Sequence, residues 1–151
     1  MVQISNGIIT VSISEVGAEV QSLRCCKSGR EYMWHGDAKW WNGHSPILFP
    51  IVGGLWNGTC RIDGAELQIS KHGFVRRATW RAIDVQTDCA TFEICSTVGT
   101  FKVFPYAFRL TVTYTLDNRT IKADFSVHNP SGCDLWFQLG GHPAIVLPDW
   151  D

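Results

Sequence analysis

The sequence YAFRLTVTYTLDNRTIKADFSVH, residues 106–128, alternates between apolar and polar side chains over most of its length. In its first part the apolar positions are Tyr106, Phe108, Leu110, Val112, Tyr114 and Leu116. After Asp117 and Asn118, which are residue types typical of turns, the alternation resumes at Ile121 and continues to Val127. A period of two residues is that of a β-strand with one buried face. The stretch therefore predicts two antiparallel strands joined by a tight turn.

Further strands are indicated along the rest of the chain. Asp63-Gly64 stands between TCRI and AELQIS, and this dipeptide favours the left-handed backbone of a tight hairpin turn. Shorter apolar runs predict strands at Ile8–Ile13, Glu19–Arg24, Arg81–Val85, Ala90–Cys95 and Leu135–Leu139. No segment shows helical periodicity. Strands this frequent, joined by short turns, predict an all-β protein, an antiparallel sandwich or barrel built as a meander.

One segment departs from this pattern. In residues 37–58, Pro46 and Pro50 interrupt an apolar run and glycines flank it, so we expect an ordered but mostly irregular connection. There is no internal repeat, low-complexity tract or linker, and residues 1–151 are therefore expected to form a single domain.

Composition excludes several classes of function. A formal net charge of -1 argues against nucleic acid and anionic membranes as partners. No apolar run approaches the ~20 residues of a membrane span, and the first residues do not resemble a signal peptide, so a cytoplasmic protein is expected. The six cysteines are scattered and form no C-x-x-C pair, which indicates free thiols and no zinc site.

His142, in QLGGHPAIVLP, is the first candidate for chemistry. If residues 135–142 form a regular strand, then Trp136, Gln138 and Gly140 share the face of His142, away from the core. An aromatic plane, an amide and an imidazole together would suit a sugar, which stacks on aromatic rings and offers hydroxyl groups. A bulge at Gly140-Gly141 would reverse this arrangement. On these residues alone, a surface or structural histidine is the simpler interpretation.

His72, in KHGFVRR, is the second candidate. It lies near Lys71, Arg76 and Arg77, and neighbouring cations favour the neutral imidazole. A neutral histidine here would serve as a hydrogen-bonding partner for a polar ligand. The alternative is a solvated basic turn, which the spacing alone favours.

Three segments in this order carry a resemblance: SPILFPIVGGL (45–55), DGAELQISKHGFVR (63–76) and LGGHPAI (139–145). Together they resemble the aldose 1-epimerase family of mutarotases, in particular the bacterial branch with H-G-F-A-R and G-G-H-P-A-F segments. The resemblance implies a large antiparallel β-sandwich of the galactose mutarotase type, with a sugar bound in an open cleft. It also implies isomerase activity on a small-molecule aldose, whose α and β anomers interconvert through ring opening, with no cofactor and no metal.

The resemblance also implies roles for particular residues. His142 matches the family's general acid and His72 its other active-site histidine, which hydrogen-bonds the sugar. Arg76 matches the last arginine of the H-G-F-A-R segment, which would either orient the loop or reach the ligand. With Gln138 and Trp136, Arg76 is predicted to bind substrate. Gly54 stands where many relatives have a sugar-contacting arginine, which leaves affinity and sugar preference open.

Smaller departures from the family pattern are Val75 for alanine and Ile145 for phenylalanine. The basic residues around His72 leave a phosphorylated sugar open as substrate. Trp34, Trp40 and Trp41 would either stack against a sugar or pack beneath the irregular segment.

The family's catalytic base is a glutamate well beyond the second histidine in a considerably longer chain. Glu66, Asp134 and Asp149 match no such position. Catalysis by these 151 residues alone is therefore expected to be impaired. A fragment, a natural truncation and half of an assembly all remain open, as does a non-catalytic carbohydrate-binding or sensing module. Unpaired strand edges also predict self-association.

Overall fold

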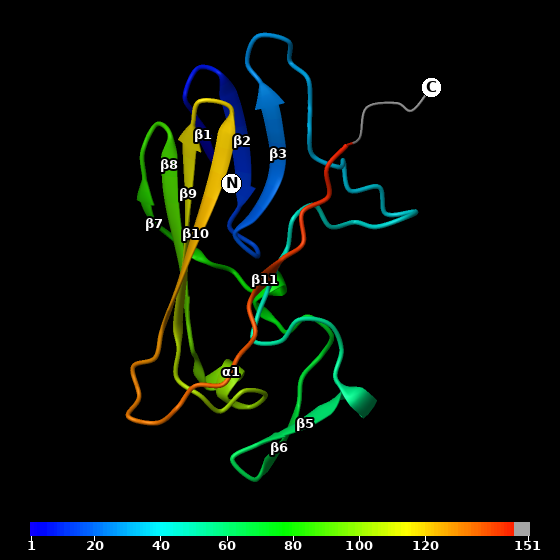
Figure 1. The fold of residues 1–151 in the computed structure, drawn as a ribbon, viewed down its shortest axis with the longest axis vertical. Helices are drawn as coiled ribbons and strands as arrows, with labels where there is room; N and C mark the ends of the chain where they lie inside the picture. Colours follow the sequence, from blue (N-terminus) through cyan, green and yellow to red (C-terminus); the bar gives the residue numbers. More distant parts are fainter. Residues whose placement is uncertain (147–151) are drawn as a thin grey trace.

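The computed structural model describes residues 1–146 and consists mainly of antiparallel strands (Figure 1). The strands are β1 (Val2–Ser5), β2 (Ile9–Ser14), β3 (Glu19–Cys25), β4 (Ile47–Leu48), β5 (Thr59–Ile62), β6 (Ala65–Gln68), β7 (Arg81–Val85), β8 (Cys89–Cys95), β9 (Arg109–Asp117), β10 (Thr120–His128) and β11 (Gly140–Gly141). The helical elements are one turn long: η1 (Trp56–Gly58), η2 (Val75–Arg77) and α1 (Val98–Phe101). Within this part of the chain, no helix has the length and apolar character needed to cross a membrane.

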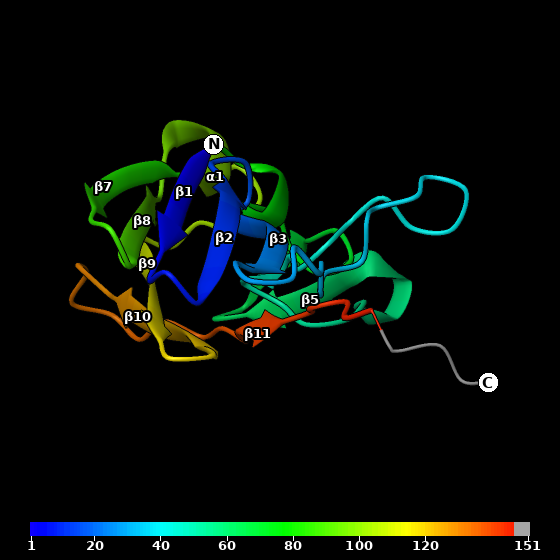
Figure 2. The ribbon, with the colours of Figure 1, turned by 90° about the horizontal axis from the view of Figure 1, so that it is seen from above.

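Two sheets form the two layers of the core. One has the order β1-β2-β3 and the other the order β10-β9-β8-β7, with all neighbours antiparallel. The layers meet at β1, where the Ser5 N–H donates to the Thr87 carbonyl at 2.6 Å, and β3 and β10 lie away from this seam (Figure 2). Every second residue along β2 and β9 is apolar and lies buried between the layers. Examples are Val11 and Ile13 of β2 and Leu110 and Val112 of β9. Burying each such side chain contributes roughly 1.5–3 kcal/mol.

Both predicted hairpins are confirmed. In β9–β10, Leu116 pairs with Ile121 across the turn, and Asn118 takes a left-handed backbone with φ of 51°. In β5–β6, Asp63 and Gly64 have φ of 50° and 80°, so both turn residues are left-handed, as a type I′ turn requires. The predicted strands near Ile8–Ile13, Glu19–Arg24, Arg81–Val85 and Ala90–Cys95 are also present as β2, β3, β7 and β8.

The strand predicted at Leu135–Leu139 is wrong, because regular pairing occurs only at Gly140–Gly141, where β11 pairs with β4. The segment next to residues 135–139 in space explains the difference. Pro46 and Pro50 flank β4 and have no N–H, so they can accept hydrogen bonds but cannot continue a ladder. Residues 135–139 are instead fixed at one point, where the Gln138 N–H donates to the Pro50 carbonyl at 2.8 Å. Residues 37–58 are mostly irregular, as predicted, apart from β4 and η1.

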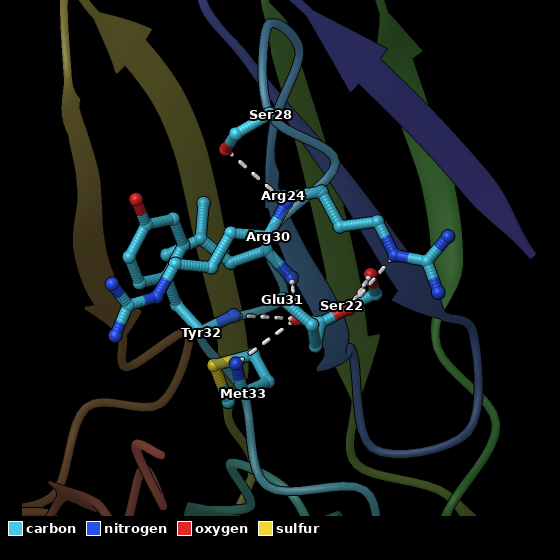
Figure 3. A network of polar contacts seen from close by, with 8 residues as sticks. Ser22, Arg24, Ser28, Arg30, Glu31, Tyr32 and Met33 are labelled. Carbon is cyan, nitrogen blue, oxygen red and sulfur yellow. Dashed lines mark hydrogen bonds and ion pairs between the residues drawn. The ribbon is translucent and has the colours of Figure 1, made fainter. Parts of the chain in front are cut away.

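A half-buried carboxylate fixes the chain where it leaves β3. Glu31 accepts hydrogen bonds from the backbone N–H groups of Leu23 and Met33 at 2.8 and 2.9 Å, and from the Ser22 hydroxyl and Arg24 (Figure 3). Burial disfavours the charged form, but the hydrogen bonds outweigh it and lower the pKa of Glu31 to about 2. Because the folded chain holds this proton less tightly than the unfolded chain does, the stabilisation is present above the unfolded value of 4.5 and is lost as the pH falls toward 2.

We predict that Glu31→Gln lowers the free energy of unfolding by about 1–3 kcal/mol at neutral pH, because backbone donors lose a charged acceptor. Urea unfolding at pH 7 measures the loss, and the gap to the native sequence should narrow as the pH falls below 4.5. Glu66→Gln is the control, since its ion pair with Arg61 at 3.7 Å is exposed. Equal effects of the two substitutions would contradict the prediction.

Candidate functional site

Residues 46–53 form a central segment to which both histidine-bearing segments attach by backbone hydrogen bonds. On one side, the His142 N–H donates to the Pro46 carbonyl at 3.1 Å, and β11 pairs with β4. On the other side, the Phe74 N–H donates to the Phe49 carbonyl at 3.1 Å and the His72 N–H to the Gly53 carbonyl at 2.8 Å. Two regions 70 residues apart in sequence are thus brought to one place by the segment that Pro46 and Pro50 keep irregular.

Gly73 is required by this arrangement. A Cβ atom at position 73 would lie 1.9 Å from the Phe49 carbonyl oxygen, and the residue has φ of 70°. The preceding His72 also has a left-handed backbone, with φ of 68°. This conformation is costly for a residue other than glycine, and it persists only where the surroundings fix it. Here the hydrogen bonds to Phe49 and Gly53 hold the loop and set the direction of the His72 side chain.

His72 is held in one tautomer. Its Nδ1 accepts a hydrogen bond from the Gly53 N–H at 3.0 Å, so the proton of the neutral imidazole lies on Nε2. Desolvation lowers the pKa of His72, and the positive charges of Arg76 and Lys71 and the nearby His142 lower it further. His72 is therefore a neutral hydrogen-bond donor through Nε2 at neutral pH.

His142 lies beside His72. The two ring centroids are 6.1 Å apart and the rings are inclined by 63°. The side chain of His142 is exposed to solvent, which confirms that it faces away from the core, whereas His72 is half-buried. Trp41 also lies beside His142, with a centroid separation of 5.1 Å. The pair of imidazoles with this indole forms what we call the imidazole surface.

Of Trp34, Trp40 and Trp41, only Trp41 contacts an imidazole of this pair within the described residues. Trp34 braces it, since its Nε1–H donates to the Trp41 carbonyl at 2.8 Å. Trp40 is 73% exposed. The sequence pointed to the group but gave no signal that distinguished Trp41 from its neighbours.

Arg76 braces the histidine loop and also borders a small polar pocket. Its Nη2 donates to the Lys71 carbonyl at 3.3 Å, across the turn that carries His72. The pocket, of about 240 Å³, is lined by Arg76, Arg77, Glu19 and Trp41 among others. Burial lowers the pKa of Arg76, and Arg77 lowers it further, while Glu19 opposes the shift. Its Nε is buried without a hydrogen-bond partner in the described part of the chain.

Gln138 and Trp136 are both exposed, as expected for the face away from the core. The Gln138 Oε1 accepts a hydrogen bond from the Val52 N–H at 2.9 Å, which ties this side chain to the central segment beside the imidazole surface. Trp136 is 59% exposed, and the adjacent Phe137 is also exposed, at 43%. Phe137 nonetheless lies 5.5 Å from the core residue Phe49 between ring centroids, and Leu135 and Leu139 pack against the core. The expected division into two faces therefore holds, although no strand ladder forms at residues 135–139.

Glu19 is a residue of this region that sequence analysis missed. Its Oε1 accepts the N–H groups of His44 and Ser45 at 2.7 and 2.8 Å, directly before the central segment. No sequence signal marks this contact, because it joins β3 to an irregular loop 25 residues away.

Other candidate groups lie elsewhere. Glu66 sits on the β5–β6 hairpin, paired with Arg61, and Asp149 is outside the described residues. Within residues 1–146, no three His, Cys, Asp or Glu side chains come together as metal ligands. All six cysteines are free thiols.

Comparison with known proteins identifies the class. The structure of a galactose mutarotase related enzyme from Lactobacillus acidophilus superposes with a TM-score of 0.95 at 37% identity, over 97% of this chain and 49% of that one. A galactose mutarotase-like protein from Lactobacillus casei gives a TM-score of 0.93 at 35% identity, over 96% and 49% of the two chains. The architecture is thus the galactose mutarotase-like antiparallel β fold, covering about half of the full-length structures.

The family follows from the sequence comparison. The aldose 1-epimerase family model matches residues 1–151. The plasmid-encoded protein LacX of Lactococcus lactis subsp. lactis is 33% identical in an alignment 153 positions long, which covers 97% of this chain and 51% of that protein. The chain belongs to the aldose 1-epimerase family, and it spans about half the length of the relatives that it matches.

We predict that the pKa of His72 lies below the ordinary histidine value of 6.5. We also predict that Arg76→Gln raises the pKa of His72, because the substitution removes a nearby positive charge. Because the folded state disfavours the charged imidazole, its contribution to stability is present above 6.5 and is lost as the pH falls through the folded pKa. Titration of the imidazole signals by NMR measures both effects. A native pKa of 6.5 or above, or no change in the variant, would show that the surrounding charges do not act on this ring.

Proposed function

We propose that this chain supplies the histidine half of an aldose 1-epimerase active site, acting on a free aldose without cofactor or metal. The observation that carries the proposal is the pair of imidazoles at the surface, 6.1 Å apart between centroids, with His72 held as a neutral donor through Nε2. Two imidazoles in one exposed place, one of them fixed in its tautomer, suit proton transfer better than they suit packing.

The proposed reaction divides its proton transfers between residues. A base removes the proton of the anomeric hydroxyl while an acid protonates the ring oxygen, so the C1–O5 bond opens and an aldehyde forms. Rotation about the C1–C2 bond and the reverse proton transfers then give the other anomer. His142 acts as the acid, because its ring is exposed to a ligand and an imidazole is the side chain best suited to give and regain a proton near neutral pH.

The other residues hold the sugar. His72 donates a hydrogen bond from Nε2 to a sugar oxygen and stays neutral, so it does not compete for the proton in transit. The Trp41 ring provides an apolar plane for the C–H face of a pyranose. Gln138 keeps its amide NH₂ group for a hydroxyl while its Oε1 is bound to Val52, and Arg76 and Trp136 contact the outer part of the ligand.

The base is proposed to come from residues outside the matched half, since the chain spans about half of its relatives. A positioned acid or base typically contributes 10²- to 10⁴-fold, so we expect this half alone to be a weak catalyst. The same half-length coverage favours a second function for the chain by itself, namely carbohydrate binding without turnover.

We predict that the chain accelerates the optical-rotation change of freshly dissolved α-D-galactose or α-D-glucose, and that His142→Ala removes most of this acceleration, on the order of 10²-fold for a lost acid. Polarimetry measures the rate, with His128→Ala as the control because His128 ends β10. Saturable sugar-dependent shifts of the His72 and His142 NMR signals without acceleration would support the binding module instead. Acceleration that survives His142→Ala, or imidazole signals that sugar leaves unchanged, would refute the assigned roles.

A further inference from the structure

The inner face of β10 is left uncovered by the opposite layer. Across the β9–β10 ladder, Phe125 pairs with Val112 and Ile121 with Leu116, so each pair points to the same side of the sheet. Val112 and Leu116 are 0% and 4% exposed, whereas Phe125 is 37% exposed. The apolar face of the sheet therefore continues past the point where the β1-β2-β3 layer stops covering it.

A groove lies along this uncovered face. It has a volume of about 290 Å³, and its lining is mostly apolar, with Val20 and Leu23 from β3, Tyr114 from β9, and Ile121 and Phe125 from β10. Its far wall is the chain from Gly141 to Ile145, including His142. The lining residues come from both β3 and β10, the strands that lie away from the β1 seam in Figure 2.

The outer edge of β10 is also open. In the sheet order β10-β9-β8-β7, β10 is a terminal strand of nine residues, and no strand in residues 1–146 pairs with its outer edge. A long edge strand without proline presents a row of free backbone N–H and C=O groups to another strand. Next to this edge lies an apolar groove, so both a strand and side chains have a place to dock.

We infer that the groove and the β10 edge receive a polypeptide equivalent to the second half of the related mutarotases. The Lactobacillus acidophilus relative superposes on this chain with a TM-score of 0.95 and yet is covered over only 49% of its length. The described chain therefore has the shape of about half of that relative. The other half of the relative matches nothing in these 151 residues. A second copy of this chain is a poorer occupant, because β10 paired with β10 extends the sheet and leaves both grooves unfilled.

The inferred interface has a consequence for the site. Because Gly141, His142 and Pro143 line the groove, the docked polypeptide contacts the segment that carries His142. This inference rests on the exposed face and on the coverage of the relatives, and it does not depend on the proposed reaction.

The test is co-expression of the 151-residue chain with the second half of the Lactobacillus acidophilus relative, followed by purification and light scattering. We expect a one-to-one complex. Phe125→Glu should weaken it by about tenfold or more, because a charge replaces a contact at the centre of the interface. Phe101→Glu is the matched control, since Phe101 is 43% exposed on α1 and lines no part of the groove. Equal binding by the two variants would overturn the inference.

A homodimer of this chain is the competing outcome, and one that persists unchanged when the second half is present would overturn the inference. If this chain and the second half of the relative do not pair as separate polypeptides, an in-frame fusion of the two is tested next. Amide hydrogen exchange of the fusion then shows whether the second half covers β10. We expect slower exchange in β10 of the fusion than in the chain alone, with Phe125→Glu reversing the protection and Phe101→Glu leaving it. Unchanged exchange in β10 would overturn the inference.

Discussion

The backbone hydrogen bonds of residues 46–53 are the constraint on which the imidazole surface depends. Pro46 accepts from His142, and Gly53 both accepts from the His72 N–H and donates to its Nδ1. One short segment therefore sets the position of both rings and the tautomer of one. Prolines usually weaken a strand, and here their missing donors confine the ladder of this segment to the two residues of β4. Its carbonyl groups remain free to bind the two histidine-bearing segments instead.

The conformation of the His72 loop and its protonation are linked. The close approach of Gly73 to Phe49 forces the left-handed turn, and the turn aims the His72 Nδ1 at the Gly53 N–H. A bond accepted by Nδ1 is lost when that nitrogen is protonated, so the same geometry disfavours the imidazolium. Arg76 acts in the same direction by charge, and its bond to the Lys71 carbonyl holds the turn closed. Backbone strain, charge and tautomer thus favour one state of the ring.

Much of this could be predicted from sequence, and the failures have a common cause. The hairpins at residues 106–128 and at Asp63-Gly64 follow from period-two alternation and turn chemistry, which are local signals. The motifs of His72 and His142 pointed to a shared place. The strand expected at Leu135–Leu139 failed because its partner contains Pro46 and Pro50, and the contacts of Trp41 and Glu19 join irregular segments. Such long-range contacts leave no periodic pattern in a single sequence.

The open side of the fold lies next to the proposed site. The proposed reaction needs both an acid and a base, and the described residues present two imidazoles, of which His142 is exposed and His72 half-buried. The groove that leaves Phe125 exposed runs up to His142, so the uncovered apolar face and the unfinished site adjoin one another. A polypeptide that buried the groove would also form the remaining wall beside His142. In the complex that we infer, completion of the core and completion of the proposed site would be one event, because the same docked polypeptide would form both.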